Sequence, residues 1–229
     1  MRRFLLLAAF ILGLSGCAGR DAVTPLNPRH TRIEWLGNEC FRITSPIGTS
    51  ILTNPYAPKT GGRSLPSNLK SDVVLITSET PQNNNVNALA NQPAILRGGV
   101  GIGVNNVTGI RIVGVPLYLN PESPSSLGMN LVYAWTMDGI RYCFAMHPSS
   151  ALDADQLAQV GRVDVLFMTP QGISATLREN FLTQLKPHLL IPAGSGAKGW
   201  TVGDKHAVQG GGLMLAREML PAGIATLHF

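Results

Sequence analysis

Residues 72–85 read DVVLITSETPQNNN. The first half is a continuous run of valine, leucine and isoleucine, and such a run predicts a buried β-strand over residues 72–77. The second half carries hydroxyl, carboxylate and amide side chains around one proline, which predicts a polar loop after that strand. The question that follows is what chemistry this loop, which contains no histidine and no aspartate, can support.

Short β-like runs recur on both sides of this segment. Asp138-Gly139 joins two of them and is a strong hairpin signal. Early antiparallel strands followed by alternating strands and helices predict an α/β fold of two sheets with helices outside. The other predicted strands cover residues 33–36, 41–44, 50–53, 110–115, 131–137, 141–145, 163–168, 189–191 and 225–228.

Helices are predicted in the second half of the chain. Asp153 can cap a helix that runs to about residue 160. Residues 175–185 carry leucine and phenylalanine at helical spacing, and a Lys-Pro pair ends that pattern. A last helix is predicted over residues 213–220, after a turn marked by three glycines. The glycine-rich residues 98–103 predict a turn, because no strand-to-helix context for a dinucleotide site surrounds them.

Composition bounds the class of protein. The chain has 229 residues, of which 45% are hydrophobic and 14% charged, and this supports one core-bearing domain. Loss of Arg2 and Arg3 with a leader would lower the basic residues from 18 to 16 against 13 acidic ones, a net charge near +3. No basic run is interleaved with aromatic residues, so the sequence predicts no nucleic-acid partner.

The N-terminus has the form of an export signal. Two arginines follow Met1, residues 4–14 are apolar, and a Leu-Ser-Gly-Cys sequence ends at Cys17. This resembles a bacterial lipoprotein signal, with residues 1–16 as signal peptide, residues 17–31 as lipidated cysteine and tether, and residues 32–229 as the domain. The resemblance implies a membrane anchor through lipid on Cys17, and Ala18 after it favours the outer membrane, facing the periplasm. The alternative is an ordinary cleaved signal with a chance cysteine.

Cys40 and Cys143 are the cysteines that remain. An exported protein can oxidise such a pair to a disulfide. Each of them also lies in an apolar, strand-like stretch, where free cysteine is often simply buried. Both alternatives stay open from the sequence.

Several short segments together carry a family resemblance. Residues 33–41 read IEWLGNECF, and they are followed in order by similar pieces. In their order and spacing, residues 32–196 resemble metallo-β-lactamase-fold proteins, and most of all the short lactonase-like hydrolases similar to ascorbate-6-phosphate lactonase. The resemblance implies a four-layer αββα sandwich. The later pieces are NPY at 54–56, LKSDVV at 69–74, GVP at 114–116 before Tyr118, DGIR at 138–141, QL at 156–157 with VDVL at 163–166, and KP at 186–187 with IP at 191–192.

The metal-binding motifs of that family are lost from this chain. The family uses a His-x-His-x-Asp-His loop, a further histidine and a bridging aspartate to hold two metal ions that activate water. His147 or Ser149 takes the bridging position, depending on a gap. Hydroxyl and amide groups are poor zinc ligands, so the resemblance implies that no zinc is bound. The other altered positions are Asn38, Asn54, Ser78, Thr80, Gln82, Asn83, Leu119 and Gly194, and Phe144 stands at a further histidine.

Three hypotheses about function follow. The leading one is an envelope lipoprotein with a non-catalytic fold that acts as a binding or structural subunit, with a protein partner in the envelope. The second is a hydrolase of an ester, lactone or phosphodiester, either metal-dependent or metal-free, with Glu79 and His147 as candidate acid and base. The third is a periplasmic lipoprotein that binds a small ligand.

Overall fold

The protein is described by a computed structural model in which residues 30–119 and 128–229 are placed. The predicted signal peptide and most of the predicted tether, with Cys17, lie outside the described residues and stay predictions. The domain was predicted to begin at residue 32, and its first strand begins at Thr31. Within the described ranges, no helix is long and apolar enough to span a membrane.

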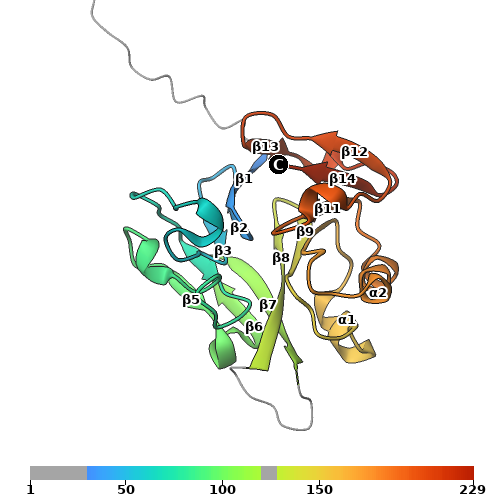
Figure 1. Ribbon diagram of the computed structural model, residues 1–229, viewed down its shortest axis with the longest axis horizontal. Helices are drawn as coiled ribbons and strands as arrows, with labels where there is room; N and C mark the ends of the chain where they lie inside the picture. The colour runs from blue at the N-terminus through green and yellow to red at the C-terminus, as the bar shows by residue number, and fades with distance from the viewer. Residues whose placement is uncertain (1–29, 120–127) are drawn as a thin grey trace, which may run out of the picture.

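Two β-sheets pack face to face (Figure 1). In the six-stranded sheet, which we call sheet A, β1 to β3 pair in antiparallel fashion and β3 to β5 in parallel. Its strand order is β13 (Gly212–Leu215), β1 (Thr31–Gly37), β2 (Cys40–Thr44), β3 (Ser50–Thr53), β4 (Val73–Leu75) and β5 (Ala94–Leu96).

The eight-stranded sheet, sheet B, is antiparallel at one end and parallel at the other. Its strands pair in antiparallel fashion from β6 to β9 and in parallel from β9 onward. Its order is β12 (Asp204–Ala207), β14 (Ala225–His228), β11 (Leu189–Pro192), β10 (Val165–Met168), β9 (Ile140–Ala145), β8 (Met129–Met137), β7 (Ile110–Tyr118) and β6 (Gly103–Val107).

The main core lies between the two sheets. Phe41 of sheet A meets Phe167 of sheet B with ring centroids 4.9 Å apart, and Phe144 lies 5.9 Å from Phe167. Trp135 stacks on Tyr142 at 5.5 Å, and both side chains are fully buried. Aromatic residues from both sheets therefore hold the sandwich together.

The outer faces of the two sheets are covered differently. Helices α1 (Ala154–Val160) and α2 (Ala175–Leu185) pack their apolar side chains on sheet B, and Asp153 forms the predicted capping box of α1. Tyr56, Leu69 and neighbouring loop residues cover the apolar part of sheet A. The predicted α/β sandwich is confirmed, and in the described residues its layer over sheet A consists of loops and short 3₁₀ turns. The 3₁₀ turns of this layer are η1 (Thr60–Gly62) and η2 (Val86–Ala88). Three further 3₁₀ turns lie outside the layer: η3 (Gly98–Gly101), η5 (Ala197–Gly199) and η6 (Arg217–Met219).

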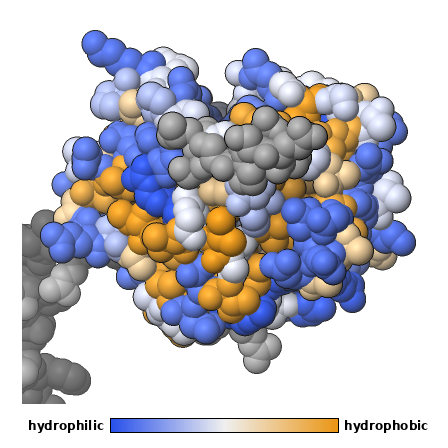
Figure 2. All heavy atoms as spheres, turned by 90° about the horizontal axis from the view of Figure 1, so that it is seen from below, coloured by the Kyte–Doolittle hydropathy of each residue, from blue (hydrophilic) through white to orange (hydrophobic). Residues whose placement is uncertain are grey.

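The free edge of sheet B exposes aliphatic side chains. Val104 in β6 is 52% exposed, and Val100 in the preceding η3 is 68% exposed. Figure 2 views this part of the molecule from below and shows apolar residues gathering on the surface there. Turn η3 also confirms the turn predicted over the glycine-rich residues.

The helix predicted over residues 213–220 is wrong. Residues 212–215 form β13, which pairs with β1 so that Leu213 lies opposite Ile33 and Leu215 opposite Thr31, and η6 follows. The free edge of β1 offers backbone partners that override the helical propensity of this segment. The structure also contains β5, β6 and β12, which the sequence did not predict.

The two cysteines are free and buried. Cys40 packs in the cluster on the outer face of sheet A, and Cys143 packs in the cluster between sheet B and its helices. The two thiols therefore lie in different clusters and form no disulfide in this structure. Burial raises the pKa of both thiols, that of Cys143 to about 12.

Candidate functional site

The loops at one end of the sandwich enclose a cavity of about 520 Å³. Chain segments leave β3, β4, β9, β10 and β11 at this end, so side chains far apart in sequence converge. Asn54, which is fully buried, bonds to the lining residue Glu39. Phe144, predicted at a histidine position, is buried in the core between the sheets instead. The predicted positions that line the cavity are Asn38, Ser78, Thr80, Gln82, Asn83, Leu119, His147 and Gly194.

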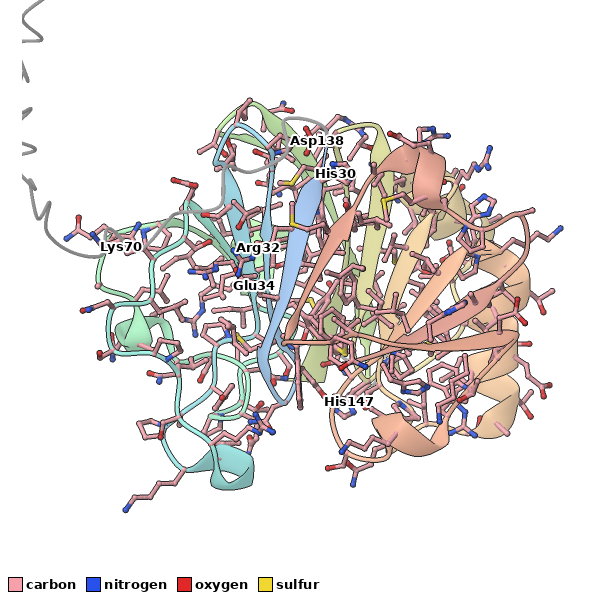
Figure 3. All side chains as sticks on the ribbon, turned by 90° about the horizontal axis from the view of Figure 1, so that it is seen from above. His30, Arg32, Glu34, Lys70, Asp138 and His147 are labelled. Atoms are coloured by element: carbon pink, nitrogen blue, oxygen red, sulfur yellow. The ribbon has the colours of Figure 1, made fainter. Side chains whose placement is uncertain are left out.

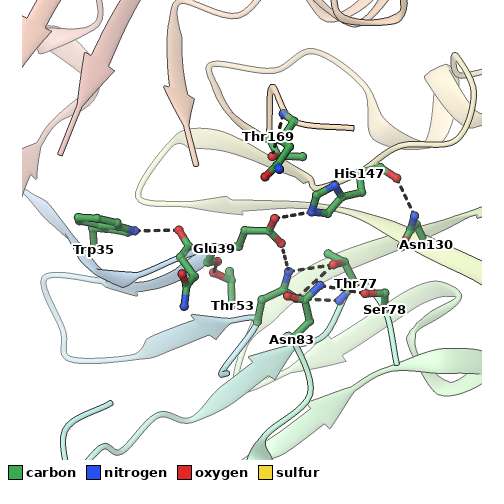
Figure 4. Close-up of polar contacts among 12 residues, drawn as sticks. Trp35, Glu39, Thr53, Thr77, Ser78, Asn83, Asn130, His147 and Thr169 are labelled. Atoms are coloured by element: carbon green, nitrogen blue, oxygen red, sulfur yellow. Dashed lines mark hydrogen bonds and ion pairs between the residues drawn. The ribbon is translucent and has the colours of Figure 1, made fainter. Parts of the chain in front are cut away.

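A carboxylate and an imidazole are joined at this cavity (Figure 4). His147 Nε2 lies 2.5 Å from Glu39 Oε1, and the Glu39 side chain is 8% exposed against 42% for His147. Asn130 Nδ2 donates to the carbonyl oxygen of His147 at 2.6 Å. The pair therefore ties the β1–β2 turn to the segment after β9, and Asn130 adds β8.

Asn54 supports Glu39 from beneath. Its Nδ2 donates to Glu39 Oε2 at 3.2 Å and to Thr77 Oγ1 at 2.9 Å, while its Oδ1 accepts from the backbone N of Thr77 at 2.9 Å. Glu39, Asn54 and Thr77 are all less than 10% exposed. Because buried polar groups need partners, this network fixes the ends of β3 and β4 against the pair.

One nitrogen of His147 is engaged, since Nε2 contacts Glu39. The hydrogen bond to Glu39 raises the pKa of His147 against the opposing effect of burial, and the charge of Glu39 and the Gln171 contact raise it further. In its protonated form His147 has no free lone pair, and in that form it is neither a metal ligand nor a general base.

The backbone is left-handed at several of these positions. The φ angle is 49° at Asn38, 38° at Asn54, 47° at His147 and 74° at Gly194. Residues other than glycine rarely adopt positive φ, and such strain of order 1 kcal/mol or more persists where surrounding contacts enforce it. The contacts around the cavity therefore enforce the backbone conformation at these positions.

The structure does not bring Glu79 to His147. Glu79 forms an ion pair with Arg97, whose Nε donates to Oε1 at 2.8 Å, and that hydrogen bond lowers the pKa of Glu79. The acid that pairs with His147 is Glu39, which the sequence reasoning missed. The sequence did offer one indication of Glu39, because it lies in the opening motif between the altered ligand position Asn38 and Cys40. Of the two open alternatives at the bridging position, His147 lines the cavity, whereas the Ser149 hydroxyl donates to the carbonyl of Tyr118.

The side chains present do not fit a zinc centre. Such a centre usually takes three or four histidine, cysteine or carboxylate ligands. In residues 30–119 and 128–229, no group of three or more such side chains is placed to hold a metal ion. At the cavity the strong donors are Glu39 and His147, and each already binds the other.

The contact between Glu39 and His147 predicts that the stability of the protein depends on pH. The pKa of His147 is raised above its ordinary value near 6.5, so the stability from the pair is fully present below that value. It is lost as the pH rises through the folded-state pKa. We expect His147→Gln to lower the free energy of unfolding by about 1 kcal/mol at pH 6, and by less at pH 9, because the site is partly exposed to solvent.

Urea unfolding between pH 5.5 and 9 measures this difference. His206→Gln in β12, where the histidine is exposed, is the control and should leave the wild-type profile unchanged. A His147→Gln penalty that stays constant across the range would contradict the imidazolium pair.

Comparison with known proteins agrees with this architecture. A sandwich of two sheets with a polar cavity at the strand ends defines the metallo-β-lactamase class of folds. A family model described as beta-lactamase superfamily domain matches residues 32–193, which is more than half of the chain. The chain therefore belongs to the beta-lactamase superfamily. Among curated proteins, none matches it.

Solved structures share the fold at low sequence identity. One is a candidate Zn-dependent hydrolase of the metallo-β-lactamase superfamily from Thermotoga maritima, 20% identical, covering 87% of this chain and 98% of that chain with a TM-score of 0.64. Another is a candidate metal-dependent hydrolase from Parabacteroides distasonis, 16% identical, covering 71% and 81% with a TM-score of 0.52. At these identities the likeness shows the fold alone, and the lactonase-like branch stays a prediction.

Proposed function

We propose that this protein is an envelope lipoprotein that uses the altered cavity of its fold to bind a ligand or partner without metal catalysis. One observation carries the proposal. Eight predicted metal-ligand positions line one cavity, and the strong donors in its described lining, Glu39 and His147, bind each other. A centre that activates water through metal ions needs those donors free.

The cavity has the features of a binding site. Its volume of about 520 Å³ lies within the range of small-ligand sites, roughly 300–1,000 Å³. Threonine, glutamine, asparagine and serine side chains line it, with Leu119 and Met129 as apolar neighbours. The described lining contains no lysine or arginine, and Glu39 and His147 offset each other, which favours an uncharged ligand rich in hydrogen-bonding groups.

The predicted N-terminal signal supports location at a membrane. A lipid on Cys17 would hold the domain in the envelope, and several acyl chains give stable anchoring. Mass spectrometry of the mature protein from a bacterial membrane fraction tests this part by itself. An acylated N-terminal Cys17 supports the anchor, and a chain that begins after residue 17 without lipid contradicts it.

Metal content tests the central part of the proposal. The mature chain with Cys17→Ser should be purified without chelator, exposed to zinc, manganese and iron, desalted and measured by mass spectrometry. We expect less than about 0.1 metal ion per chain, because zinc sites require three or four strong ligands. Binding of one equivalent that His147→Ala removes would contradict the proposal.

A metal-free hydrolase is the second candidate. The contact between Glu39 and His147 favours it, because a carboxylate–imidazole pair is a common acid–base unit. The neighbours named as candidate hydrolases also suggest substrates with a hydrolysable bond. Turnover of a lactone or ester panel by the metal-free protein, lost in both Glu39→Gln and His147→Gln, would support this candidate over a binding protein.

A further inference from the structure

A second hollow, rich in arginine, lies on the surface of sheet B. We call it the arginine hollow, and its volume is about 450 Å³. Asp164 is the acidic residue in its lining. The charged lining residues are Arg111, Arg141, Arg162, Arg217 and Asp164.

The aspartate is buried, and Arg141 is engaged by the carbonyl oxygen of Val160, whereas Arg162 and Arg217 keep much of their side chains exposed. Asp164 is 2% exposed, and its Oδ2 accepts from the backbone N of Arg141 at 2.8 Å and lies 3.3 Å from Arg217 Nη1. The side chains of Arg162 and Arg217 are 71% and 53% exposed. Burial, and to a smaller extent the like charge of Arg111, lower the pKa of Arg141. A bound anion would relieve this repulsion, so the hollow favours negatively charged groups.

The arginine hollow and the cavity lie at opposite ends of the same strands. Strand β8 runs from Met129 at the cavity to Met137, and the β8–β9 turn at Gly139 lines the hollow. Strand β9 then returns from Arg141 towards His147. Figure 3 shows this separation, with Asp138 and His147 at opposite ends of the molecule.

The domain begins beside the arginine hollow. Thr31 at the start of β1 donates its hydroxyl to Asp138 of the β8–β9 turn at 2.9 Å. The segment from Cys17 to His30 spans at most about 45 Å when fully extended. If Cys17 carries a lipid, this end of the domain is held within that distance of the membrane, but a flexible tether alone sets no orientation.

We propose that the arginine hollow docks on the anionic head groups of membrane phospholipids and orients the tethered domain. The phosphates fit the exposed guanidinium groups, which bind such oxygens in pairs. Met219, 50% exposed in the same 3₁₀ turn as Arg217, supplies an apolar side chain beside the charges. Docking here turns the cavity away from the membrane and leaves it open to its ligand. The choice of a membrane as the anion source rests on the proposed lipid anchor.

Vesicle binding by a lipid-free chain tests the surface separately from the anchor. Mature chain with Cys17→Ser is sedimented with vesicles of phosphatidylglycerol and phosphatidylethanolamine, or of phosphatidylcholine alone. Each cation near an anionic surface strengthens binding about fivefold. We expect the anionic vesicles to bind at least tenfold more tightly, with an advantage that falls as salt is raised.

A matched pair of variants localises the effect. Arg111→Gln with Arg162→Gln removes two exposed charges from the hollow, and should weaken binding to anionic vesicles about 25-fold, at about fivefold for each charge. Lys59→Gln with Lys198→Gln removes two charges near the cavity end, and should change binding less than twofold. Equal losses in both variants, or no preference for anionic vesicles, would overturn the inference. Thermal unfolding of each variant confirms that the fold is intact.

The outcomes separate this inference from the proposed function. If vesicles bind through the arginine hollow and Cys17 proves unmodified, the docking surface is supported and the proposed lipid anchor is contradicted. If Cys17 is acylated but the protein shows no preference for anionic vesicles, the lipid anchor is supported and the docking surface is contradicted. Metal content bears on neither result.

Discussion

Phe167→Ala is expected to lower the free energy of unfolding by about 4 kcal/mol, the largest effect of any change considered for this protein. Phe167 in β10 is fully buried, and its ring lies 4.9 Å from that of Phe41 in the opposite sheet. Alanine removes the ring that joins the two sheets and leaves a cavity that neighbouring strands cannot close. Since domains of this kind are stable by about 5–15 kcal/mol, the loss is a large share of the total.

Urea unfolding followed by circular dichroism measures the effect. Phe167→Leu keeps most of the volume and should cost less than about 1.5 kcal/mol. Ile47→Ala, at a side chain that is 89% exposed, should change stability by less than about 0.5 kcal/mol. A loss below about 1.5 kcal/mol for Phe167→Ala would contradict the packing described between the sheets.

Apolar strands and capped helices could be predicted from the sequence because their signals are local. The α2 bounds agree with the predicted residues 175–185, and Asp153 caps α1 as predicted, with Gln156 completing a capping box. These elements depend on periodicity and on contacts within a few residues. The β-propensity of a buried run such as residues 72–77 is equally local.

Edge strands could not be predicted because their partners lie far away in sequence. Strand β13 forms only because the edge of β1 accepts it, and β12 pairs with β14 across a long connection. The residues of β12 are all exposed and follow no alternation of apolar and polar side chains. For such segments tertiary pairing decides the conformation, and a local pattern carries little information.

The site positions could be predicted, but their partners could not. Matching motifs identified residues that converge on one cavity, because the fold fixes where each strand ends. The pairing of Glu39 with His147, and of Glu79 with Arg97, depends on side-chain directions across separate strands. The sequence predicted a pair of Glu79 and His147 because a sequence does not show in which direction each side chain points.

Asn54→Ala is expected to lower the free energy of unfolding by about 3 kcal/mol. The change leaves Glu39 Oε2 and both polar groups of Thr77 without their partner in a fully buried setting, and each unsatisfied group costs about 1–3 kcal/mol. Alanine also tolerates the φ of 38° less well than asparagine does. Asn54→Gly relieves the backbone but loses the same hydrogen bonds, so it should be more stable than the alanine variant by about 1 kcal/mol.

Asn54→Asp separates hydrogen bonding from charge, because it replaces the amide with a carboxylate of nearly the same shape. In this chain the new carboxylate would lie against Glu39 Oε2, which is 3.2 Å from Asn54 Nδ2, and would repel it. We therefore expect Asn54→Asp to be at least as destabilising as alanine at pH 7 and to recover at pH 4.5, where the pair can share a proton. Urea unfolding at both pH values measures the recovery. An aspartate variant as stable as the wild type at pH 7 would contradict the predicted repulsion between the two carboxylates.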